Sequence, residues 1–406
     1  MARIVQKFGG TSVANIDCIK NAAQRVKMEY DSGNEVIVVV SAMSGVTNQM
    51  INYVDQIGGL FDAQEYDVVV SSGEQSNAGL MALAVQSLGI PARSWLGWQI
   101  AIQTDDVYGK ARITGINTEE LEKRLAHGEV AVVPGFQGVS PTNRVTTLGR
   151  GGSDLSAVAL AGALEADRCD IYTDVDGIYT TDPRIVSKAQ KLDKITYEEM
   201  LEMASLGSKV LQARSVELAM NHNVRLQVRS SFENTPGTIV VSEDDILEKQ
   251  VVSGISQSKD EAKITLLKIA DQPGIAAAIF GPLADAAINV DMIVQNISED
   301  GNTTNLTFTV GMTDLKRAVD VLETNKMKIG IGEILSDSDV VKISVVGIGM
   351  RSNAGVAQKM FMTLAEKGIN IKVISTSEIK VSVLVAEEYG ELAVRALHAA
   401  YGLDAN

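Results

Sequence analysis

Histidine and cysteine are scarce in this chain of 406 residues. With only three histidines, His127, His222 and His398, neither a histidine-built metal site nor a Ser-His-Asp triad is expected. The two cysteines, Cys18 and Cys169, show no metal-ligand spacing and no disulfide framework, which favours a reducing compartment such as the cytoplasm.

Positive charge and long apolar runs are also in short supply. The chain has 36 Lys and Arg against 51 Asp and Glu, a net charge of −15, which argues against nucleic acid as a partner. No apolar run could span a bilayer and the first residues lack the core of a signal peptide, so no membrane partner is expected. A hydrophobic content of 45% predicts a globular protein, and the length suggests two or three domains.

The most informative segment is Gly149-Arg-Gly-Gly-Ser-Asp154, between strand-like runs at residues 129–136 and 168–174. Adjacent glycines let the backbone approach a ligand, and Arg150 offers a planar fork of donors to a carboxylate or phosphate. A helix predicted over residues 155–164 would point its first N–H groups at the same anion. Asp154 fits two interpretations equally well, a helix N-cap or a catalytic residue.

The first forty residues predict a βαβ unit of a parallel sheet. A strand over residues 4–8 runs into Gly9 and Gly10, a helix follows, and the β-branched run at residues 35–40 is typical of a strand buried on both faces. Lys7 then lies at the end of the first strand, where open α/β sheets bind ligands. The loop lacks P-loop spacing, and a lone lysine beside two glycines is more often a solvated charge at a turn.

Further polar residues follow other predicted strands. Ser41 and Thr47 lie in a small-residue loop after the second strand, and Glu74 comes just after a third strand predicted over residues 67–71. Glu74 could merely complement a helix dipole. Because the carboxyl ends of parallel strands meet at one edge, we expect these side chains and Lys7 to share a cleft.

Two later segments have several interpretations. The acids of residues 173–184 lack EF-hand spacing, and a tyrosine-lined turn that holds a nucleotide fits as well. Thr196-Tyr-Glu-Glu199 is a capping box that opens a helical region, in which Lys209 follows a glycine and could face a ligand.

An internal repeat begins after residue 245. Residues 263–269 (KITLLKI) resemble residues 342–348 (KISVVGI), and each copy predicts strand, loop, helix, strand, strand and helix, the ferredoxin-like order. Gly347-Ile-Gly349 looks like part of a dinucleotide fingerprint, but the third glycine is missing and too few residues follow for a Rossmann domain.

Taken in order, five segments closely resemble the aspartate kinase family: residues 7–12, 41–47, 72–74, 149–154 and 173–184. The resemblance spans essentially the whole chain. The length of the chain is similar to that of the monofunctional enzymes of this family. It implies an α/β amino-acid kinase fold over residues 1–245, with a mostly parallel open sheet and helices on both faces. Two ferredoxin-like α+β ACT domains would follow, over residues 246–336 and 337–406.

The resemblance implies transfer of the γ-phosphate of ATP, with Mg²⁺, to the side-chain carboxylate of L-aspartate. The product would be 4-phospho-L-aspartate, the first intermediate of lysine, threonine and methionine biosynthesis. A carboxylate is already ionised at pH 7, so positioning and charge neutralisation replace a general base.

Site residues follow from the same resemblance. Lys7 and Asp154 would be catalytic, and no metal ligand is directly assignable. The nucleotide would be held by Lys7, Gly9, Gly10, Thr173, Asp174, Tyr179, Asp182, Arg184 and Lys209. Aspartate would be held by Ser41, Thr47, Glu74, Arg150, Gly151, Gly152 and Ser153.

The ACT pair implies inhibition by lysine, threonine or both, and assembly into a homo-oligomer or an α₂β₂ complex. Which of these applies, and whether the same gene also makes a shorter regulatory subunit, stays open. The effector would be held by Asp271, Ile275, Ala276, Asn289, Gln295, Asn370, Ile371 and Thr376. A kinase for glutamate or acetylglutamate would lack the ACT pair, and a silent amino-acid sensor would lack Lys7 or Asp154.

Overall fold

The computed structural model describes residues 1–58, 61–100, 102–205, 210–246, 251–297 and 303–404. The chain divides into two compact units. The first comprises Met1–Ile178, Lys191–Ala204 and Lys209–Leu247, and the second comprises Tyr179–Gln190, Ser205–Ser208 and Glu248–Asn406.

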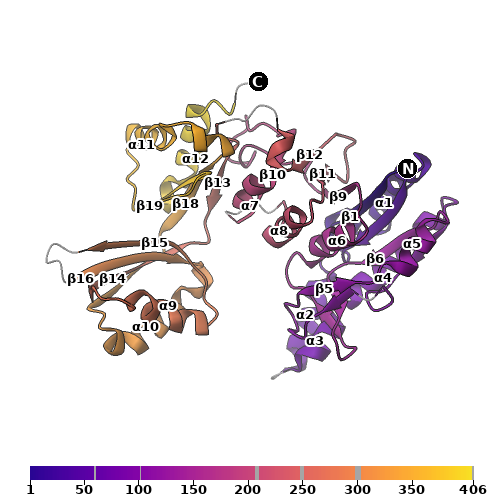
Figure 1. The fold of residues 1–406 in the computed structure, drawn as a ribbon, viewed down its shortest axis with the longest axis horizontal. Coiled ribbons are helices and arrows are strands. Elements are labelled where there is room, and N and C mark those ends of the chain that lie inside the picture. Colours follow the sequence, from indigo (N-terminus) through magenta and orange to yellow (C-terminus); the bar gives the residue numbers. More distant parts are fainter. Residues whose placement is uncertain (59–60, 101, 206–209, 247–250, 298–302, 405–406) are drawn as a thin grey trace. The chain divides into compact units, whose positions relative to one another are not determined.

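A mostly parallel sheet forms the centre of the first unit, as predicted (Figure 1). Its strand order is β10-β12-β11-β9-β1-β2-β6-β3. Among the described strand pairs of this sheet, only β11 and β12 are antiparallel. The strands are β1 (Arg3–Phe8), β2 (Glu35–Val40), β3 (Ala92–Ser94), β6 (Val130–Pro134), β9 (Arg168–Thr173), β10 (Lys194–Thr196), β11 (Leu226–Ser230) and β12 (Thr238–Val241). A smaller sheet, in the order β5-β4-β7-β8, contains β4 (Ile102–Thr104), β5 (Ile113–Ile116), β7 (Gln137–Val139) and β8 (Val145–Thr147).

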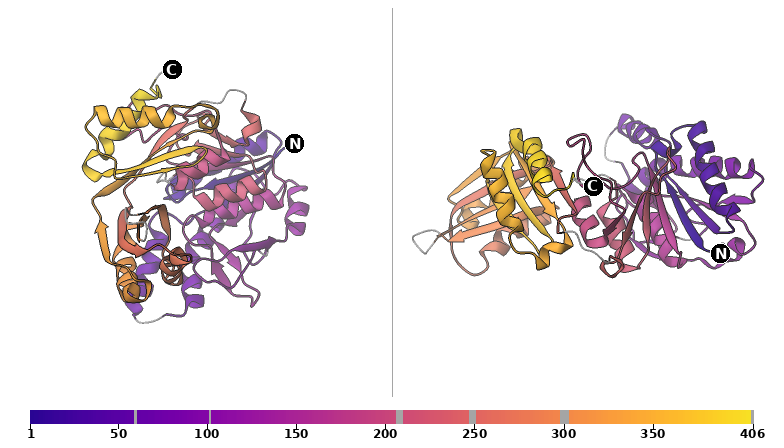
Figure 2. Two further views of the ribbon diagram at one scale, coloured as in Figure 1. Left: turned by 60° about the vertical axis from the view of Figure 1, so that its left-hand side comes forward. Right: turned by 90° about the horizontal axis from the view of Figure 1, so that it is seen from above.

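Helices cover both faces of the large sheet (Figures 1 and 2). The helices of the first unit are α1 (Ile16–Asp31), α2 (Val46–Ile57), α3 (Ala63–Val70), α4 (Ser72–Gln86), α5 (Glu119–Leu125), α6 (Gly152–Ala163), α7 (Tyr197–Ser205) and α8 (Ala213–Asn221), with short 3-10 turns at Thr11–Val13 and Glu243–Asp245. The β-branched run of β2 is buried on both sides, because α1 and α4 pack against one face and α6 contacts β1, β2 and β9.

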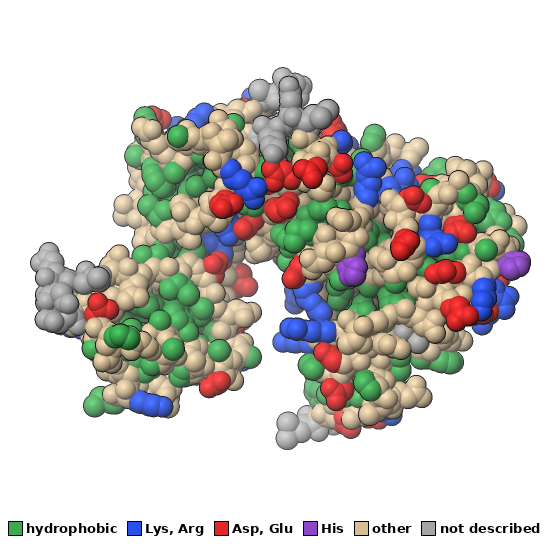
Figure 3. All heavy atoms as spheres, viewed as in Figure 1, with side chains coloured by type: hydrophobic (Ala, Val, Ile, Leu, Met, Phe, Trp, Pro, Cys, Tyr) green, Lys and Arg blue, Asp and Glu red, His purple; other side chains and the backbone are tan. Residues whose placement is uncertain are grey.

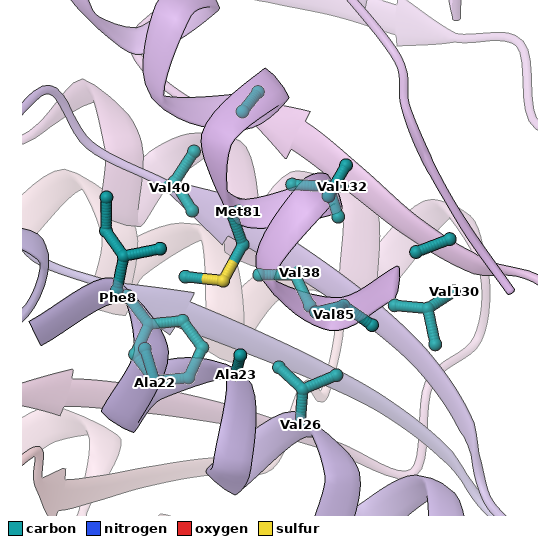
Figure 4. Close-up of a cluster of buried hydrophobic side chains, with 14 of the residues drawn as sticks. Phe8, Ala22, Ala23, Val26, Val38, Val40, Met81, Val85, Val130 and Val132 are labelled. Carbon is teal, nitrogen blue, oxygen red and sulfur yellow. The ribbon is translucent and has the colours of Figure 1, made fainter. Parts of the chain in front are cut away.

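A cluster of buried hydrophobic side chains lies between the sheet and helices α1 and α4 (Figure 4). Val38 and Val40 of β2 pack against Met81 and Val85 of α4 there, and Phe8, the last residue of β1, belongs to the same cluster. Burial of such side chains contributes roughly 1.5–3 kcal/mol each relative to exposure. The core therefore fixes the end of β1, and with it Lys7.

The strand predicted over residues 67–71 is wrong, because this run is helical. Helix α3 begins where the Asp62 side chain accepts a hydrogen bond from the Gln64 N–H at 2.8 Å, and α4 follows immediately after Ser71. The Asp67 carboxylate turns into the interior and accepts three hydrogen bonds from Gly109 and Thr147. A local cap and these tertiary contacts override the β-propensity of the valines.

The predicted capping box at Thr196 is confirmed. The backbone N–H of Thr196 donates to Glu199 Oε2 at 3.1 Å, and the N–H of Glu199 donates to Thr196 Oγ1 at 3.2 Å. This reciprocal pair opens α7.

The second unit contains the predicted repeat. One copy, the first ACT module, runs β14-α9-β15-β16-α10-β17, and the other, the second ACT module, runs β18-α11-β19-β20-α12 together with β13. The sheet orders are β15-β16-β14-β17 and β13-β18-β20-β19. The strands are β13 (Gly254–Ser258), β14 (Ala262–Ala270), β15 (Val290–Ile297), β16 (Thr303–Val310), β17 (Glu333–Asp337), β18 (Val340–Val346), β19 (Val373–Thr376) and β20 (Lys380–Ala386). The helices are α9 (Ile275–Asp285), α10 (Leu315–Ile329), α11 (Val356–Glu366) and α12 (Gly390–Ala400), with 3-10 turns at Met312–Asp314, Ile348–Ser352 and Glu387–Tyr389.

The surface carries side chains of both charges. On the face drawn in Figure 3, Lys and Arg side chains are interspersed with Asp and Glu. Within the described ranges, no helix combines the length and the apolar character that crossing a membrane requires. Cys18 and Cys169 are both free thiols.

Candidate active site

A cavity of about 310 Å³ lies in the first unit, beside the carboxyl ends of β1 and β2 and the first turn of α6. It is lined by Lys7, Gly10, Ser41, Ala42, Met43, Ser44, Gly45, Thr47, Glu74, Phe136, Gly149, Arg150, Gly151, Gly152, Ser153 and Asp154. The predicted aspartate-binding residues and both predicted catalytic residues therefore meet at one place. Such a position, at the carboxyl ends of parallel strands, is where open α/β sheets bind ligands.

Lys7 and Asp154 form an ion pair in this cavity. Lys7 Nζ lies 2.6 Å from Asp154 Oδ1, and both side chains are about nine-tenths buried. The residue that caps α6 is Gly151, in the left-handed region, without any side-chain hydrogen bond, and Asp154 stands in the first turn. The N-cap interpretation of Asp154 is thus excluded, and its carboxylate pairs with Lys7 instead.

The loop from Gly149 to Gly151 has a backbone that favours glycine. Both residues have positive φ, +77° and +73°, and a Cβ on Gly151 would lie 2.0 Å from Gln212 Cγ. The loop therefore packs closely on α8 and turns Arg150 and the N-terminus of α6 toward the cavity. A guanidinium and the first N–H groups of a twelve-residue helix together favour an anionic ligand.

Glu74 supplies the opposite charge. It enters the cavity from the first turn of α4 rather than from a strand end, and its side chain is 4% exposed. Burial raises the pKa of Glu74 to about 7, although the backbone amide of Ala42 partly offsets this. Among the described residues its Oε2 atom has no hydrogen-bond partner. A buried carboxylate with unused acceptor capacity is suited to a cationic group of a ligand.

The loop of Ser41 and Thr47 is held against α4. Asn77 Nδ2 donates to the Ser41 carbonyl at 2.6 Å, and a Cβ on Gly73 would lie 2.8 Å from Ala42 Cβ. Thr47 stands in the first turn of α2, which Gly45 caps with positive φ. Three elements, β2, α2 and α4, thus position this wall of the cavity.

The predicted nucleotide residues are more widely distributed. Gly10 lines the cavity, and Gly9 lies beside it, where a Cβ would be 3.3 Å from Lys7 Nζ. Thr173 ends β9 next to β1, and Asp174 accepts a hydrogen bond from its hydroxyl at 3.1 Å. Lys209 lies outside the described residues.

The remaining nucleotide residues, Tyr179, Asp182 and Arg184, belong to the second unit. Arg184 donates to both carboxylate oxygens of Asp182, and these hydrogen bonds hold the pKa of Asp182 below its usual value.

Sequence reasoning missed Phe136, which lines the cavity. The strand predicted over residues 129–136 ends at Pro134, and Phe136 has a φ of +70°. Its N–H donates to Ser156 Oγ at 3.1 Å, which ties the turn to α6. The signal was the Pro134-Gly135 pair, which is typical of the end of a strand.

The described residues contain no cluster of three or more His, Cys, Asp or Glu that could hold a metal ion. Mg²⁺ in phosphotransferases is typically held by one or two carboxylates together with the phosphates of the nucleotide. The acidic lining of the cavity, Asp154 and Glu74, fits an ion carried by a nucleotide rather than one held by a cage of side chains.

The predicted effector residues lie near helix α9 of the first ACT module and helix α11 of the second. Asp271 and Ala276 are exposed on either side of the start of α9, and Asn289 and Gln295 are exposed before and on β15. Ile275 is 6% exposed and packs in the core of the first ACT module, so only its backbone can face an effector. In the second module Asn370 and Thr376 are exposed, and Ile371 is half-buried.

Comparisons with known proteins agree with this architecture. Residues 2–230 match the amino acid kinase family, and residues 268–325 and 343–401 match ACT domains. The chain is 53% identical over 406 residues to an aspartate kinase of Stutzerimonas stutzeri. The alignment covers 100% of this chain and 98% of that protein.

Solved structures show the same likeness. The chain resembles E. coli aspartokinase III in complex with aspartate and ADP, in its R state, with a TM-score of 0.82, 27% identity and coverage of 98% and 99% of the two chains. The T-state structure of that enzyme, with lysine and aspartate, gives a TM-score of 0.77 at 27% identity, with 98% of each chain covered.

Proposed function

The chain belongs to the aspartate kinases of the amino acid kinase family, and from this premise we propose that it transfers the γ-phosphate of ATP to L-aspartate. The product is 4-phospho-L-aspartate, the first intermediate of lysine, threonine and methionine biosynthesis. The observation that carries the proposal is the cavity itself, which sets the Lys7–Asp154 pair beside a buried carboxylate, Glu74, and a guanidinium, Arg150.

The charges of the cavity complement those of aspartate. Arg150 and the N-terminus of α6 bind the α-carboxylate, and Glu74 accepts hydrogen bonds from the ammonium group. Ser41, Thr47 and Ser153 supply hydroxyls, and Gly151 and Gly152 let the substrate approach the backbone. Held at both ends, the substrate is left with its side-chain carboxylate as the nucleophile, directed toward Lys7.

The reaction then needs charge neutralisation more than proton transfer. The carboxylate attacks the γ-phosphorus, the bond to the bridging oxygen of ADP breaks, and no proton has to move. Lys7 stabilises the charge that builds on the transferred phosphoryl group, and Asp154 orients Lys7 at 2.6 Å. Mg²⁺, when bound with the nucleotide, neutralises phosphate charge. Gly9, Gly10, Thr173, Asp174, Tyr179, Asp182, Arg184 and Lys209 hold the nucleotide.

Regulation and assembly belong to the same proposal. Residues 1–245 form the catalytic domain, and the ACT domains at 246–336 and 337–406 bind lysine, threonine or both as inhibitors. E. coli aspartokinase III has been solved with lysine, which supports an amino-acid effector. Pairing of ACT modules between chains would give a homo-oligomer or an α₂β₂ complex, and the cytoplasmic location stays a prediction.

Measurement of ADP release tests the proposal. With ATP and Mg²⁺, we expect turnover with aspartate and at least tenfold lower kcat/KM with glutamate, because one extra methylene displaces the nucleophile by about 1 Å or more. The reaction should be repeated with lysine, threonine and an equimolar mixture. Equal turnover with glutamate, or none with aspartate, would contradict the assignment.

A further inference from the structure

The segment Tyr179–Gln190 belongs to the unit of the ACT modules, although the residues on both sides of it belong to the catalytic unit. Its two ends are held in the catalytic unit at Ile178. The N–H of Ile178 donates to Thr238 Oγ1 at 2.8 Å, and its carbonyl accepts from the Leu192 N–H at 2.8 Å. The chain thus contributes residues 179–190 to the second unit and returns to the first unit at Lys191.

The loop is anchored on the second ACT module. The carbonyl of Thr180 accepts a hydrogen bond from the Ile255 N–H at 2.7 Å, and Ile255 lies on β13, which pairs with β18. The side chains of Ile185 and Val186 pack against the hydrophobic core of this module. These contacts attach the loop to both the sheet and the core.

A buried polar pair completes the anchor. Thr180 Oγ1 lies 2.9 Å from His398 Nε2 of α12, and the two residues are 3% and 1% exposed. The same Oγ1 accepts the Gln190 N–H at 3.0 Å, so one hydroxyl joins the far end of the loop to α12. Burial lowers the pKa of His398, which keeps the imidazole neutral and suited to a hydroxyl partner.

The anchor lies two residues from Asp182. The Asp182 carbonyl accepts the N–H groups of Ile185 and Val186 at 2.9 and 3.0 Å, and its carboxylate is held by Arg184. Residues 182–186 therefore form a hydrogen-bonded turn, which the chain connects to the anchor at Thr180 through a single residue.

Resting on the proposed function, in which Asp182 and Arg184 hold the nucleotide, we propose that Thr180 and His398 are positioning residues for ATP. Through this pair the second ACT module fixes the conformation of the nucleotide-binding loop. Any state of the module that displaces α12 then changes nucleotide affinity, and by linkage bound nucleotide favours the undisplaced state.

Nucleotide binding by the full chain tests the proposal. In Thr180→Val, which keeps the shape and loses the hydroxyl, we expect the Kd for ADP by calorimetry and the KM for ATP to rise about tenfold. The kcat and the KM for aspartate should stay within about twofold. Thr180→Ser, which keeps the hydroxyl, should restore nucleotide affinity. His398→Leu should reproduce the defect, and the double variant should add nothing further.

The exposed His127 supplies a matched control, since His127→Leu should leave ADP affinity unchanged. If Thr180→Val does not fold, His398→Leu still measures the pair. Unchanged ADP affinity in the folded variants, with only a lower Tm, would reduce the contact to a structural one and overturn the proposal. A wild-type chain that binds ADP and fails to phosphorylate aspartate would instead overturn the proposed function.

Discussion

In the proposed mechanism, Lys7 is the residue whose charge matters most during phosphoryl transfer. It lies near the end of β1, 2.6 Å from Asp154, and its side chain is about nine-tenths buried. Lys7→Ala should lower kcat about 10²–10³-fold, because an electrostatic contribution of this kind acts mainly in the transition state. The Kd for aspartate, measured by calorimetry, should change far less. Near-normal turnover would remove Lys7 from the mechanism.

Glu74 should make aspartate binding depend on pH. Since its pKa in the free protein is raised to about 7, the carboxyl is protonated below that value and loses its attraction for the substrate ammonium. We expect kcat/KM for aspartate to fall as the pH drops from 8 to 6. Glu74→Gln should flatten this part of the profile and raise the KM for aspartate more than that for ATP. A larger change in the ATP constant would place Glu74 on the nucleotide side.

The same residue should reduce stability. Its pKa of about 7 in the folded protein exceeds the value of roughly 4.3 in an unfolded chain, so the native state binds the extra proton and is favoured at low pH. That contribution is lost as the pH rises through 7. At pH 8.5, Glu74→Gln should therefore unfold at a higher denaturant concentration than wild type, with a free energy of unfolding larger by about 1–3 kcal/mol. At pH 5 the two proteins should differ little. A destabilised Gln variant at pH 8.5 would show that the carboxylate has partners in the native state.

Several of these residues could be predicted from the sequence because their roles depend on local chemistry. A lysine before two glycines and an arginine between glycines at the start of a helix indicate anion binding when they are taken together, although the lysine alone is a weak signal. Phe136 and Asn77 could not be found in this way. Phe136 reaches the cavity through an unusual φ, and Asn77 acts through a hydrogen bond to Ser41, so both depend on tertiary structure.

At the scale of elements, α3 holds the strand that leads into the Gly149 loop. The buried Asp67 carboxylate accepts hydrogen bonds from the Thr147 N–H, the Thr147 hydroxyl and the Gly109 N–H, at 2.8, 2.7 and 2.9 Å. Gly109 in turn approaches Gly149, because its carbonyl lies 3.2 Å from the site of a Cβ there. Asp67 therefore supports the loop that carries Arg150 without lining the cavity.

Asp67→Asn should weaken this support. An amide presents hydrogens where the carboxylate accepted them, so we expect a loss of about 1–3 kcal/mol in the free energy of unfolding, together with a higher KM for aspartate. Glu65→Gln is the matched control on α3, because Glu65 makes only an exposed ion pair with Arg144. Denaturation curves and initial rates for both variants decide the matter. Equal behaviour of the two would refute a supporting role for Asp67.

The order of elements could be predicted better than the identity of every one. The β-branched runs of β2 and β6 and the repeated strand–helix pattern after residue 260 are strong periodic signals, and both correspond to elements in the structure. The run Asp67-Val-Val-Val-Ser71 has the composition of a strand. Its helical conformation depends on the cap at Asp62 and on contacts with the hairpin of β7 and β8, more than forty residues away. Sequence periodicity contains no information on such partners.

At the scale of the whole molecule, regulation must link a catalytic unit to an ACT unit. An effector can shift the balance of two states only by its differential affinity for them, typically about 1–3 kcal/mol. The ammonium group of lysine or threonine needs an acceptor, and Asp271 is an exposed carboxylate in the loop between β14 and α9. Gln295, exposed on β15, offers an amide in the same module.

Asp271→Ala should therefore leave kcat and both Michaelis constants of the uninhibited enzyme nearly unchanged while it weakens inhibition at least about tenfold, the equivalent of ~1.4 kcal/mol. Asp285→Ala, which removes an exposed acid from the other end of α9, serves as the control and should keep normal inhibition. Each variant is titrated with lysine, with threonine and with an equimolar mixture, since the effector is part of what is being tested. If the Asp271→Ala curves superimpose on those of wild type for every effector that inhibits, the loop acid is only a solvated charge ahead of Pro273, and the effector site lies elsewhere.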